Sequence, residues 1–240
     1  LGGKTPLGMS MLQASFPLVG SPYAFAQHGK SGAWISELFP HTAKVADDLC
    51  FIKSLHSDAV NHDPALTFIQ TGAPLPGRPS MGSWVSYGLG SDNQDLPSFI
   101  VLVSKTPADQ PLSSRLWDSG FLASRFQGVQ FRSGVDPVLY LSNPKGIDSA
   151  ANRRMLDRLR ELHQLENSTN PHAEIEARID QFEMAFRMQS AVPDVTDLEQ
   201  EPQNVRDLYG PDVKTPGSFA ANCLLARRLA QKGVRFIQLY

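Results

Sequence analysis

The most constraining feature of the sequence is a run of five consecutive apolar residues, Phe99 to Val103. The run predicts a buried strand over residues 97–104. It lacks the apolar–polar alternation of a strand with one face in water, so both faces of this strand are expected to be covered. That arrangement is typical of a parallel sheet with helices on either side.

Other segments fit the same kind of sheet. Residues 49–55 and 234–240 contain apolar runs of strand length, and we predict that they lie beside 97–104 in one sheet. Helices are expected over 63–71, 81–89 and 217–232, and a further helix, broken at Pro40, over 33–46. This alternation of strands and helices predicts an α/β fold.

Local signals mark the ends of these helices. Asp63 followed by Pro64 is expected to cap the first helix, which would end at Thr71 with Gly72 in the left-handed conformation. Ser80 and Gly90 are expected to bound the second helix in the same way.

Two long helices over about 148–166 and 171–190 are predicted to form an antiparallel hairpin, a lobe of about 148–190 beside the sheet. Glu183 and Arg187 are spaced to form a pair on the solvent side of the second helix. We expect residues 1–240 to form one α/β domain.

The ends of the sequence suggest that this domain is partial. The chain begins at Leu1 without a methionine and ends at Tyr240, directly after a predicted core strand. We therefore expect an interior piece of a longer protein, with a parallel-sheet core that is incomplete at both ends.

The composition excludes several classes of protein. The 22 basic and 24 acidic residues give a net charge of −2, which argues against a nucleic-acid partner. No apolar segment approaches the roughly 20 residues that span a bilayer. Two cysteines cannot build a disulfide framework or a four-thiolate zinc site. The composition does not indicate an oligomeric state.

Most of the candidate chemistry lies in residues 56–64, which follow a predicted strand and open a helix. In parallel α/β sheets this corner is where ligands bind, and the helix N-terminus favours an anion. The segment contains His56, Asp58, Asn61, His62 and Asp63. The alternative is that Asp63 caps the helix and the histidines belong to a surface loop.

A second candidate is Arg78, in the segment Pro76 to Ser83. An arginine just before a capped helix is able to bind an anionic group with two hydrogen bonds. The alternative is a solvated loop in which Ser80 is only a helix cap.

Four segments together resemble an uncharacterised bacterial family, the domain of unknown function numbered 1501. The resemblance covers nearly the whole chain. The segments are Ser31–Leu38, Asn61–Ala65, Gly77–Trp84 and Phe219–Leu229.

That family is placed in the alkaline phosphatase and sulfatase superfamily, whose members bind one or two divalent metals at the carboxyl edge of a parallel sheet. The resemblance implies that His62 occupies the position of the sulfatase nucleophile, with Pro64 and Thr71-Gly72 at matching spacing. The sequence departs from the sulfatase pattern at two positions. No cysteine or serine stands at position 62, and Leu66 replaces an arginine. A formylglycine mechanism is therefore not expected.

The resemblance implies a metal-dependent hydrolase of phosphate or sulfate esters, acting on a small-molecule or glycan ester. His62 and Asn61 would be catalytic, His62 and His56 would be metal ligands, and Arg78 and Asp63 would contact substrate. A zinc, manganese or calcium ion is expected in the complete protein. The 240 residues alone are not expected to hold a metal, because other ligands of the family would lie beyond both ends.

The resemblance also implies export to the periplasm or cell surface, by a signal upstream of Leu1. A different class of function is a non-catalytic exported binding or surface protein on the same fold, because the usual nucleophile and arginine are missing.

Overall fold

A computed structural model describes residues 4–6, 15–17, 19–59, 61–105, 112–134, 136–167 and 173–240. The chain divides into two compact units, residues 1–60 and 61–240, and each is described by itself. The prediction of one domain over 1–240 stays a prediction.

The first unit is built from short antiparallel hairpins. Strands β1 (Lys4–Pro6) and β2 (Ser15–Pro17) pair with each other, as do β3 (Phe25–His28) and β4 (Ala33–Ser36). The short helix α1 (Pro40–Lys44) and a 3-10 turn at Ala46–Asp48 follow.

One carboxylate closes the β3–β4 turn. Asp47 accepts hydrogen bonds from the backbone N–H groups of Lys30 and Ser31, each at 2.8 Å. These bonds lower the pKa of Asp47. They fix the β3–β4 hairpin, whose second strand lies at the start of the helix expected over 33–46.

Two sequence predictions fail in this unit. The helix expected over 33–46 is strand β4 followed by α1, because Pro40 begins a new helix and residues 33–36 pair with β3. Residues 49–55 form no strand, and Leu49, Phe51 and Ile52 are exposed. This segment therefore does not join the sheet.

The second unit contains a three-stranded parallel sheet in the order β6–β5–β7. The strands are β5 (Phe99–Leu102), β6 (Val129–Phe131) and β7 (Phe236–Leu239), and β5 pairs in parallel with both neighbours. The predicted neighbours 97–104 and 234–240 are confirmed. The described chain is thus a mixed α/β structure.

Strand β5 separates two apolar clusters. Phe99 and Val101 point to one side and pack with Leu116 and Trp117. Ile100 and Leu102 point to the other side, because successive side chains of a strand alternate. Both sides are covered, as the unbroken apolar run predicts.

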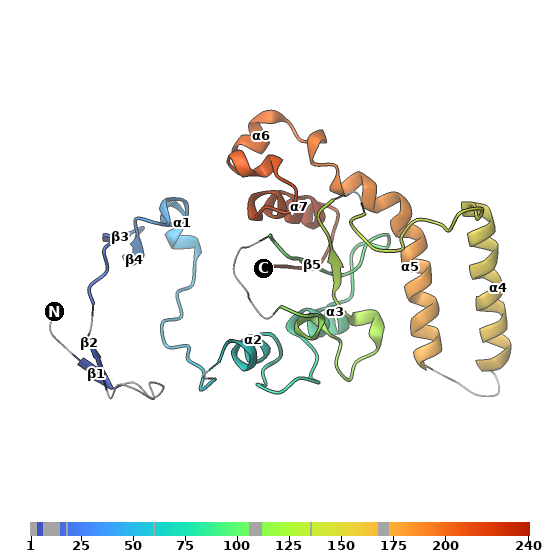
Figure 1. Cartoon of the computed structure of the whole chain (residues 1–240), viewed down its shortest axis with the longest axis horizontal. Coiled ribbons are helices and arrows are strands. Elements are labelled where there is room, and N and C mark those ends of the chain that lie inside the picture. The colour runs from blue at the N-terminus through green and yellow to red at the C-terminus, as the bar shows by residue number, and fades with distance from the viewer. Residues whose placement is uncertain are drawn as a thin grey trace. The chain divides into compact units, whose positions relative to one another are not determined.

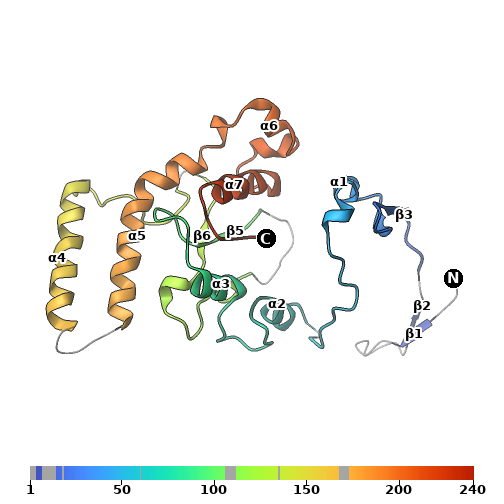
Figure 2. The ribbon, with the colours of Figure 1, turned by 180° about the vertical axis from the view of Figure 1, so that it is seen from behind.

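Helices cover both faces of the sheet (Figure 1). On the Phe99 side lie α2 (His62–Thr71) and α3 (Met81–Leu89), and on the Ile100 side lie the end of α5 (Ala173–Thr196) and α7 (Phe219–Gln231). Figure 2 shows the sheet and these helices from behind. The remaining elements are α4 (Ser149–Asn167), α6 (Gln203–Asp207) and 3-10 turns at Ser114–Trp117, Ser124–Phe126, Leu198–Gln200 and Pro211–Lys214.

The predicted helix ends are largely confirmed. Gly72 ends α2 with φ 74°, and Gly90 ends α3 with φ 65°. The Ser80 hydroxyl caps α3 by accepting from the Ser83 N–H, and Ser218 caps α7 by accepting from Ala221.

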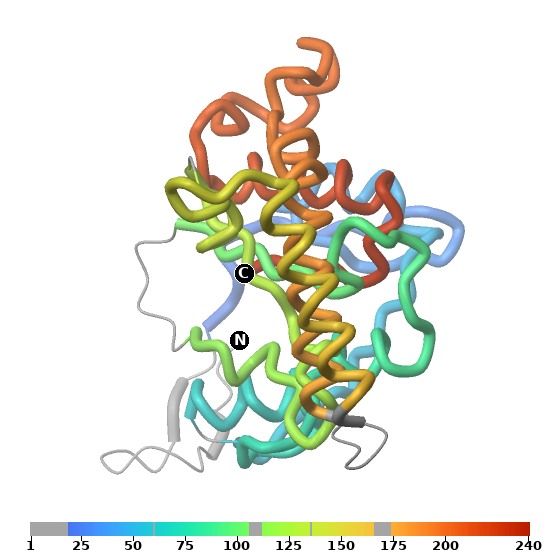
Figure 3. The backbone as a smooth tube through the Cα atoms, turned by 90° about the vertical axis from the view of Figure 1, so that its right-hand side faces the viewer, coloured from blue at the N-terminus to red at the C-terminus, as the bar shows by residue number. Residues whose placement is uncertain are grey.

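Helices α4 and α5 lie side by side (Figures 1 and 3). Helix α5 extends to Thr196, beyond the predicted end at residue 190, because Val192 and Val195 are buried in the Ile100 cluster. This burial anchors the hairpin to the sheet.

A buried carboxylate joins the two helices of this hairpin. Glu183, only 5% exposed, accepts from both terminal nitrogens of Arg153, at 2.6 and 2.5 Å. Arg160 is 3.4 Å away. The predicted solvent-side pair is therefore wrong, since Arg187 instead donates to the Gln94 carbonyl at 2.5 Å.

We predict that Glu183→Gln lowers the free energy of unfolding by about 1.5–3 kcal/mol at pH 7, because the charge-assisted bonds are lost. Hydrogen bonds from Arg153 hold the pKa of Glu183 below its ordinary value of 4.5. The contribution of this carboxylate is therefore complete above pH 4.5 and is lost as the pH falls through the lower folded-state pKa. Urea unfolding should show the difference between the two proteins shrinking in that range.

Glu161→Gln is the matched control, because Glu161 pairs with Arg158 at the surface of α4. It should change the stability much less. An equal loss in both variants would contradict the role assigned to Glu183.

Close packing between α3 and β5 yields a second prediction. A methyl group added at Gly82 would lie 2.5 Å from ring atoms of Phe99, whereas one at Gly88 would meet nothing within 4 Å. Gly82→Ala should therefore lower the free energy of unfolding by about 1–3 kcal/mol. Gly88→Ala should raise it by about 0.5–1 kcal/mol, because glycine is a poor helix former. Thermal and urea unfolding measure both, and equal effects would contradict this packing.

Candidate functional site

The carboxyl ends of the three parallel strands gather polar groups at one edge of the sheet. Ser104 and Lys105 follow β5, Arg132 follows β6, and Tyr240 follows β7. The Ser104 N–H donates to the Tyr240 carbonyl at 2.8 Å, and the Lys105 N–H donates to the Gly217 carbonyl at 2.8 Å. This is the edge where open α/β sheets bind ligands.

A buried hydrogen bond joins this edge to α7. The Asn222 side-chain amide donates to the Ser104 hydroxyl at 3.0 Å, and both residues are buried. Asn222 lies in the second turn of α7 among leucines and alanines. The bond satisfies two buried polar groups and fixes the start of α7 against the end of β5.

Tyr240 covers the other side of the same edge. Its ring lies 5.9 Å from that of Trp117, and its hydroxyl accepts from the Gln238 side-chain amide at 2.8 Å. Burial raises the pKa of Tyr240 to about 12. The phenol is therefore protonated at neutral pH and has a proton to donate.

Helix α2 reaches this region through the Phe99 cluster. Leu66 of α2 packs on that cluster, and Asp63 forms an ion pair with Arg115, whose neighbour Leu116 is a core member. Figure 1 shows α2 beneath the end of β7, which is marked C. The first turn of α2 is thereby held against the turn at Ser114–Trp117.

The role predicted for Asp63 as a helix cap is wrong. The N-cap position of α2 is Asn61, which is extended, with φ −130° and ψ 153°, and no side chain caps the helix. The carboxylate of Asp63 is engaged by Arg115 instead. Arg115 was not identified from the sequence, because it lies 52 residues away in the chain.

The remaining predicted site residues are accessible. His62, Asn61 and Arg78 are all exposed. Among the described residues, none of these three side chains has a hydrogen-bond or ion-pair partner. The described structure therefore leaves all three side chains free to contact a ligand.

His56 lies in the other unit. Its Nε2 is 3.9 Å from a carboxylate oxygen of Asp58, and both side chains are fully accessible. Within the described parts of the chain, no three histidine, cysteine, aspartate or glutamate side chains are placed to hold a metal ion. The metal-ligand roles of His56 and His62 stay predictions.

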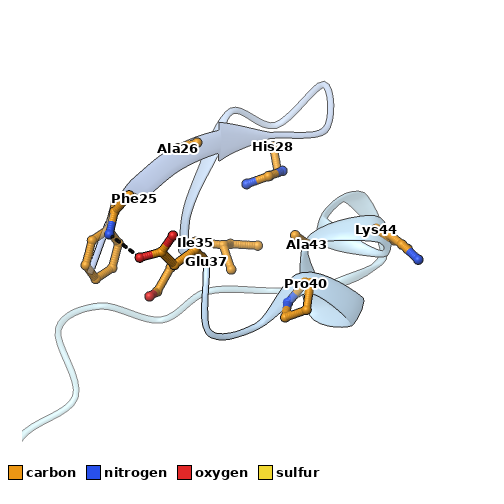
Figure 4. Close-up of a pocket in the computed structure, with 10 residues that line it drawn as sticks. Phe25, Ala26, His28, Ile35, Glu37, Pro40, Ala43 and Lys44 are labelled. Atoms are coloured by element: carbon orange, nitrogen blue, oxygen red, sulfur yellow. Dashed lines mark hydrogen bonds between the residues drawn. The ribbon is translucent and has the colours of Figure 1, made fainter. Parts of the chain in front are cut away.

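The N-terminal unit has a cavity of its own, of about 470 Å³, between the β3–β4 hairpin and α1. Figure 4 shows the apolar side chains of Phe25, Ile35 and Pro40 around it, with His28 on one wall. The Glu37 carboxylate is held by the backbone N–H of Ala24 at 2.9 Å. This carboxylate supports the hairpin.

Sequence reasoning missed Ser104, Asn222 and Tyr240. The sequence does mark Ser104 as a candidate site residue, because it directly follows the apolar run of β5, where a parallel strand ends. The sequence also marks Asn222, because this polar residue interrupts the apolar face of a predicted helix. Their contact joins residues 118 positions apart, and no local pattern indicates it.

The fold and this edge define a mixed α/β protein with polar residues at the carboxyl ends of a parallel sheet. Residues 3–240 match the model of a family described as "Protein of unknown function (DUF1501)", so the chain belongs to that family. No curated protein and no solved structure matches the chain. In the described residues, no helix is both long and apolar enough to cross a membrane.

We predict that the 240-residue chain does not bind Zn²⁺ tightly. A catalytic zinc needs three protein ligands, and His56 with His62 and one adjacent aspartate would provide a weak set. Isothermal titration calorimetry with Zn²⁺ tests this expectation. Stoichiometric, tight binding that His62→Ala abolishes would show that the segment 56–63 forms a complete local site.

Proposed function

We propose that the protein is a hydrolase of phosphate or sulfate esters and that the start of α2 holds the reacting group. The observation that carries the proposal is the position of His62, an exposed imidazole at the first residue of a ten-residue helix. No side chain caps the first turn, so its backbone N–H groups are available to an anion.

The proposal extends to the architecture. We infer that the parallel sheet with helices on both faces is part of an alkaline-phosphatase-like core. The proline two residues after His62, and the Thr71-Gly72 ending of the helix, support a relationship to sulfatases. Export to the periplasm or cell surface belongs to the same proposal.

In the proposed reaction, the neutral imidazole of His62 attacks the phosphorus or sulfur atom of the ester. A bond from nitrogen to that atom forms as the bond to the alcohol oxygen breaks, and the leaving oxygen takes a proton from water. The hydroxide left from that water then attacks the same atom, the bond to nitrogen breaks, and phosphate or sulfate leaves as the imidazole is regenerated. This is covalent catalysis in two steps.

Neighbouring groups would stabilise the negative charge on the transferred group. The Asn61 side-chain amide would donate to a non-bridging oxygen, and the α2 N-terminus would favour the added charge. Arg78 would bind an anionic part of a small-molecule or glycan substrate. Asp63 is neutralised by Arg115, so this carboxylate would not repel the ester.

A divalent metal, zinc, manganese or calcium, belongs to the proposal for the complete protein. The side chains described here do not fit such an ion, because no three candidate ligands converge.

We predict that His62→Ala lowers kcat/KM for ester hydrolysis by the full-length protein by about three orders of magnitude or more. The reason is that the variant lacks the attacking nitrogen. Hydrolysis of 4-nitrophenyl phosphate and 4-nitrophenyl sulfate, with Zn²⁺, Mn²⁺ or Ca²⁺ added in parallel, measures the effect.

His41→Ala is the matched control, because His41 is an exposed histidine on α1. It should retain full activity. Added imidazole should partly restore activity to His62→Gly if the ring is the nucleophile. Equal, robust turnover by the parent protein and His62→Ala would remove His62 from the mechanism.

The second candidate function is a non-catalytic exported binding or surface protein. It is favoured by the sequence at the start of α2, where His62 stands in place of a cysteine or serine and Leu66 in place of an arginine. Metal analysis of the folded full-length protein separates the two functions. A metal-free protein without turnover would favour the binding function.

A further inference from the structure

A cavity of about 590 Å³ opens at the carboxyl end of β6, between the end of α5, α6 and the start of α7. All of its lining residues belong to the 61–240 unit. Its volume is in the range of sites for small organic ligands. Neither His62 nor the other residues of the α2 N-terminus line it.

Part of the cavity wall is apolar. It includes Phe131, Val213 and Leu225, which are buried side chains from β6, the 3-10 turn at 211–214 and α7. These elements are held in place by the core around the sheet. An apolar part of a ligand would therefore gain contact without a large rearrangement of the protein.

Three cations, Arg132, Arg206 and Lys214, line the same cavity. Among the described residues, Arg132 and Lys214 have no ion-pair partner. Arg206 donates to the Gln203 side chain at 2.9 Å, but its Nε is buried without a partner. Because this nitrogen is inaccessible to solvent, Arg206 contributes its positive charge to the cavity lining rather than a free donor.

Two carboxylates, Asp197 and Glu199, also line the cavity. The two oxygens of Asp197 already accept from the Glu199 N–H at 3.2 Å and the Gln200 side chain at 3.1 Å. Asp197 is thus used to cap the turn at Leu198–Gln200. Three cations against two carboxylates leave the lining with a net positive charge.

One wall is fixed by a close approach of backbone. Gly217 has φ 82°, and a Cβ there would lie 2.3 Å from the Ser133 hydroxyl. Only glycine allows the loop before α7 to pass this close to the end of β6. Arg132 is next to Ser133 in the chain and Lys214 lies three residues before Gly217, so this contact fixes the backbone near both cations.

We propose that this cavity binds a small molecule with an apolar or ring-shaped body and one oxyanion group. Arg132 and Lys214 would hold the oxyanion, and the wall of Phe131, Val213 and Leu225 would hold the body. Phosphate, sulfate and carboxylate share this chemistry. The proposal does not depend on ester hydrolysis at His62.

The test is calorimetric titration of the intact chain with phenylphosphonate, which has no ester bond to cleave. Benzenesulfonate and benzoate are titrated in parallel to identify the favoured anion, and phenol serves as the uncharged analogue. We expect at least one anion to bind about tenfold or more tightly than phenol. Arg132→Gln and Lys214→Gln should each weaken that binding about tenfold, because each removes a charge-assisted contact.

Arg154→Gln and Lys145→Gln are the matched controls, since both residues are exposed and lie outside the cavity lining. They should bind as the parent chain does, and so should His62→Ala. Circular dichroism and thermal unfolding establish that each variant is folded, and the two cavity variants lie on different elements, so either one decides the test.

Loss of affinity in a cavity variant, with the controls unchanged, supports the proposal whichever of the three anions is preferred. Three outcomes would overturn it: no saturable binding of any anion, equal binding of phenol, or equal affinity in cavity and control variants. Loss of hydrolysis in His62→Ala, with anion binding unchanged, separates this cavity from the proposed ester site.

Discussion

The arrangement of the 61–240 unit depends on the burial of strand β5 on both faces. All four of its residues are at most 1% exposed, and the strand pairs on both edges. Because its side chains alternate, two apolar faces must be covered at once, and helices before and after it in the chain are drawn to opposite sides. Gly82 illustrates how tight this cover is, since α3 approaches β5 so closely that a methyl group would collide with Phe99.

The same burial explains why polar groups collect where the strands end. A parallel strand that is apolar throughout carries no hydrogen-bonding side chain along its length, so the first polar side chains appear at its ends. At the carboxyl end of β5, the Ser104 hydroxyl is still buried, and Asn222 of α7 supplies its partner. Strand β5 thereby fixes the position of the start of α7 as well as the edge of the sheet.

Features encoded by neighbouring residues could be predicted from the sequence, and features made by distant ones could not. The ends of α2 and α3 follow from Gly72, Ser80 and Gly90, because a cap depends on a few adjacent backbone groups. The pairing of Ala33–Ser36 with Phe25–His28 was missed, because Trp34 and Ile35 occur equally well in a helix or an edge strand. For residues 49–55, an apolar run predicted a strand, but no neighbouring strand pairs with it.

The candidate site was predictable to a smaller extent than the fold, and the charged residues show why. Asp63 was expected to cap a helix, and Glu183 was expected to pair at the surface with Arg187. Arg115 and Arg153 instead neutralise these carboxylates, at sequence separations of 52 and 30 residues. A sequence identifies which residues carry charge, but only the fold determines which charges are already compensated. Arg132 and Lys214 gain their significance in this way, because the fold sets them at a cavity and, within the described chain, supplies neither with a carboxylate partner. Arg132 and Lys214, as unpaired cations beside a cavity, therefore indicate an anion site more strongly than Arg78 does by its position before α3.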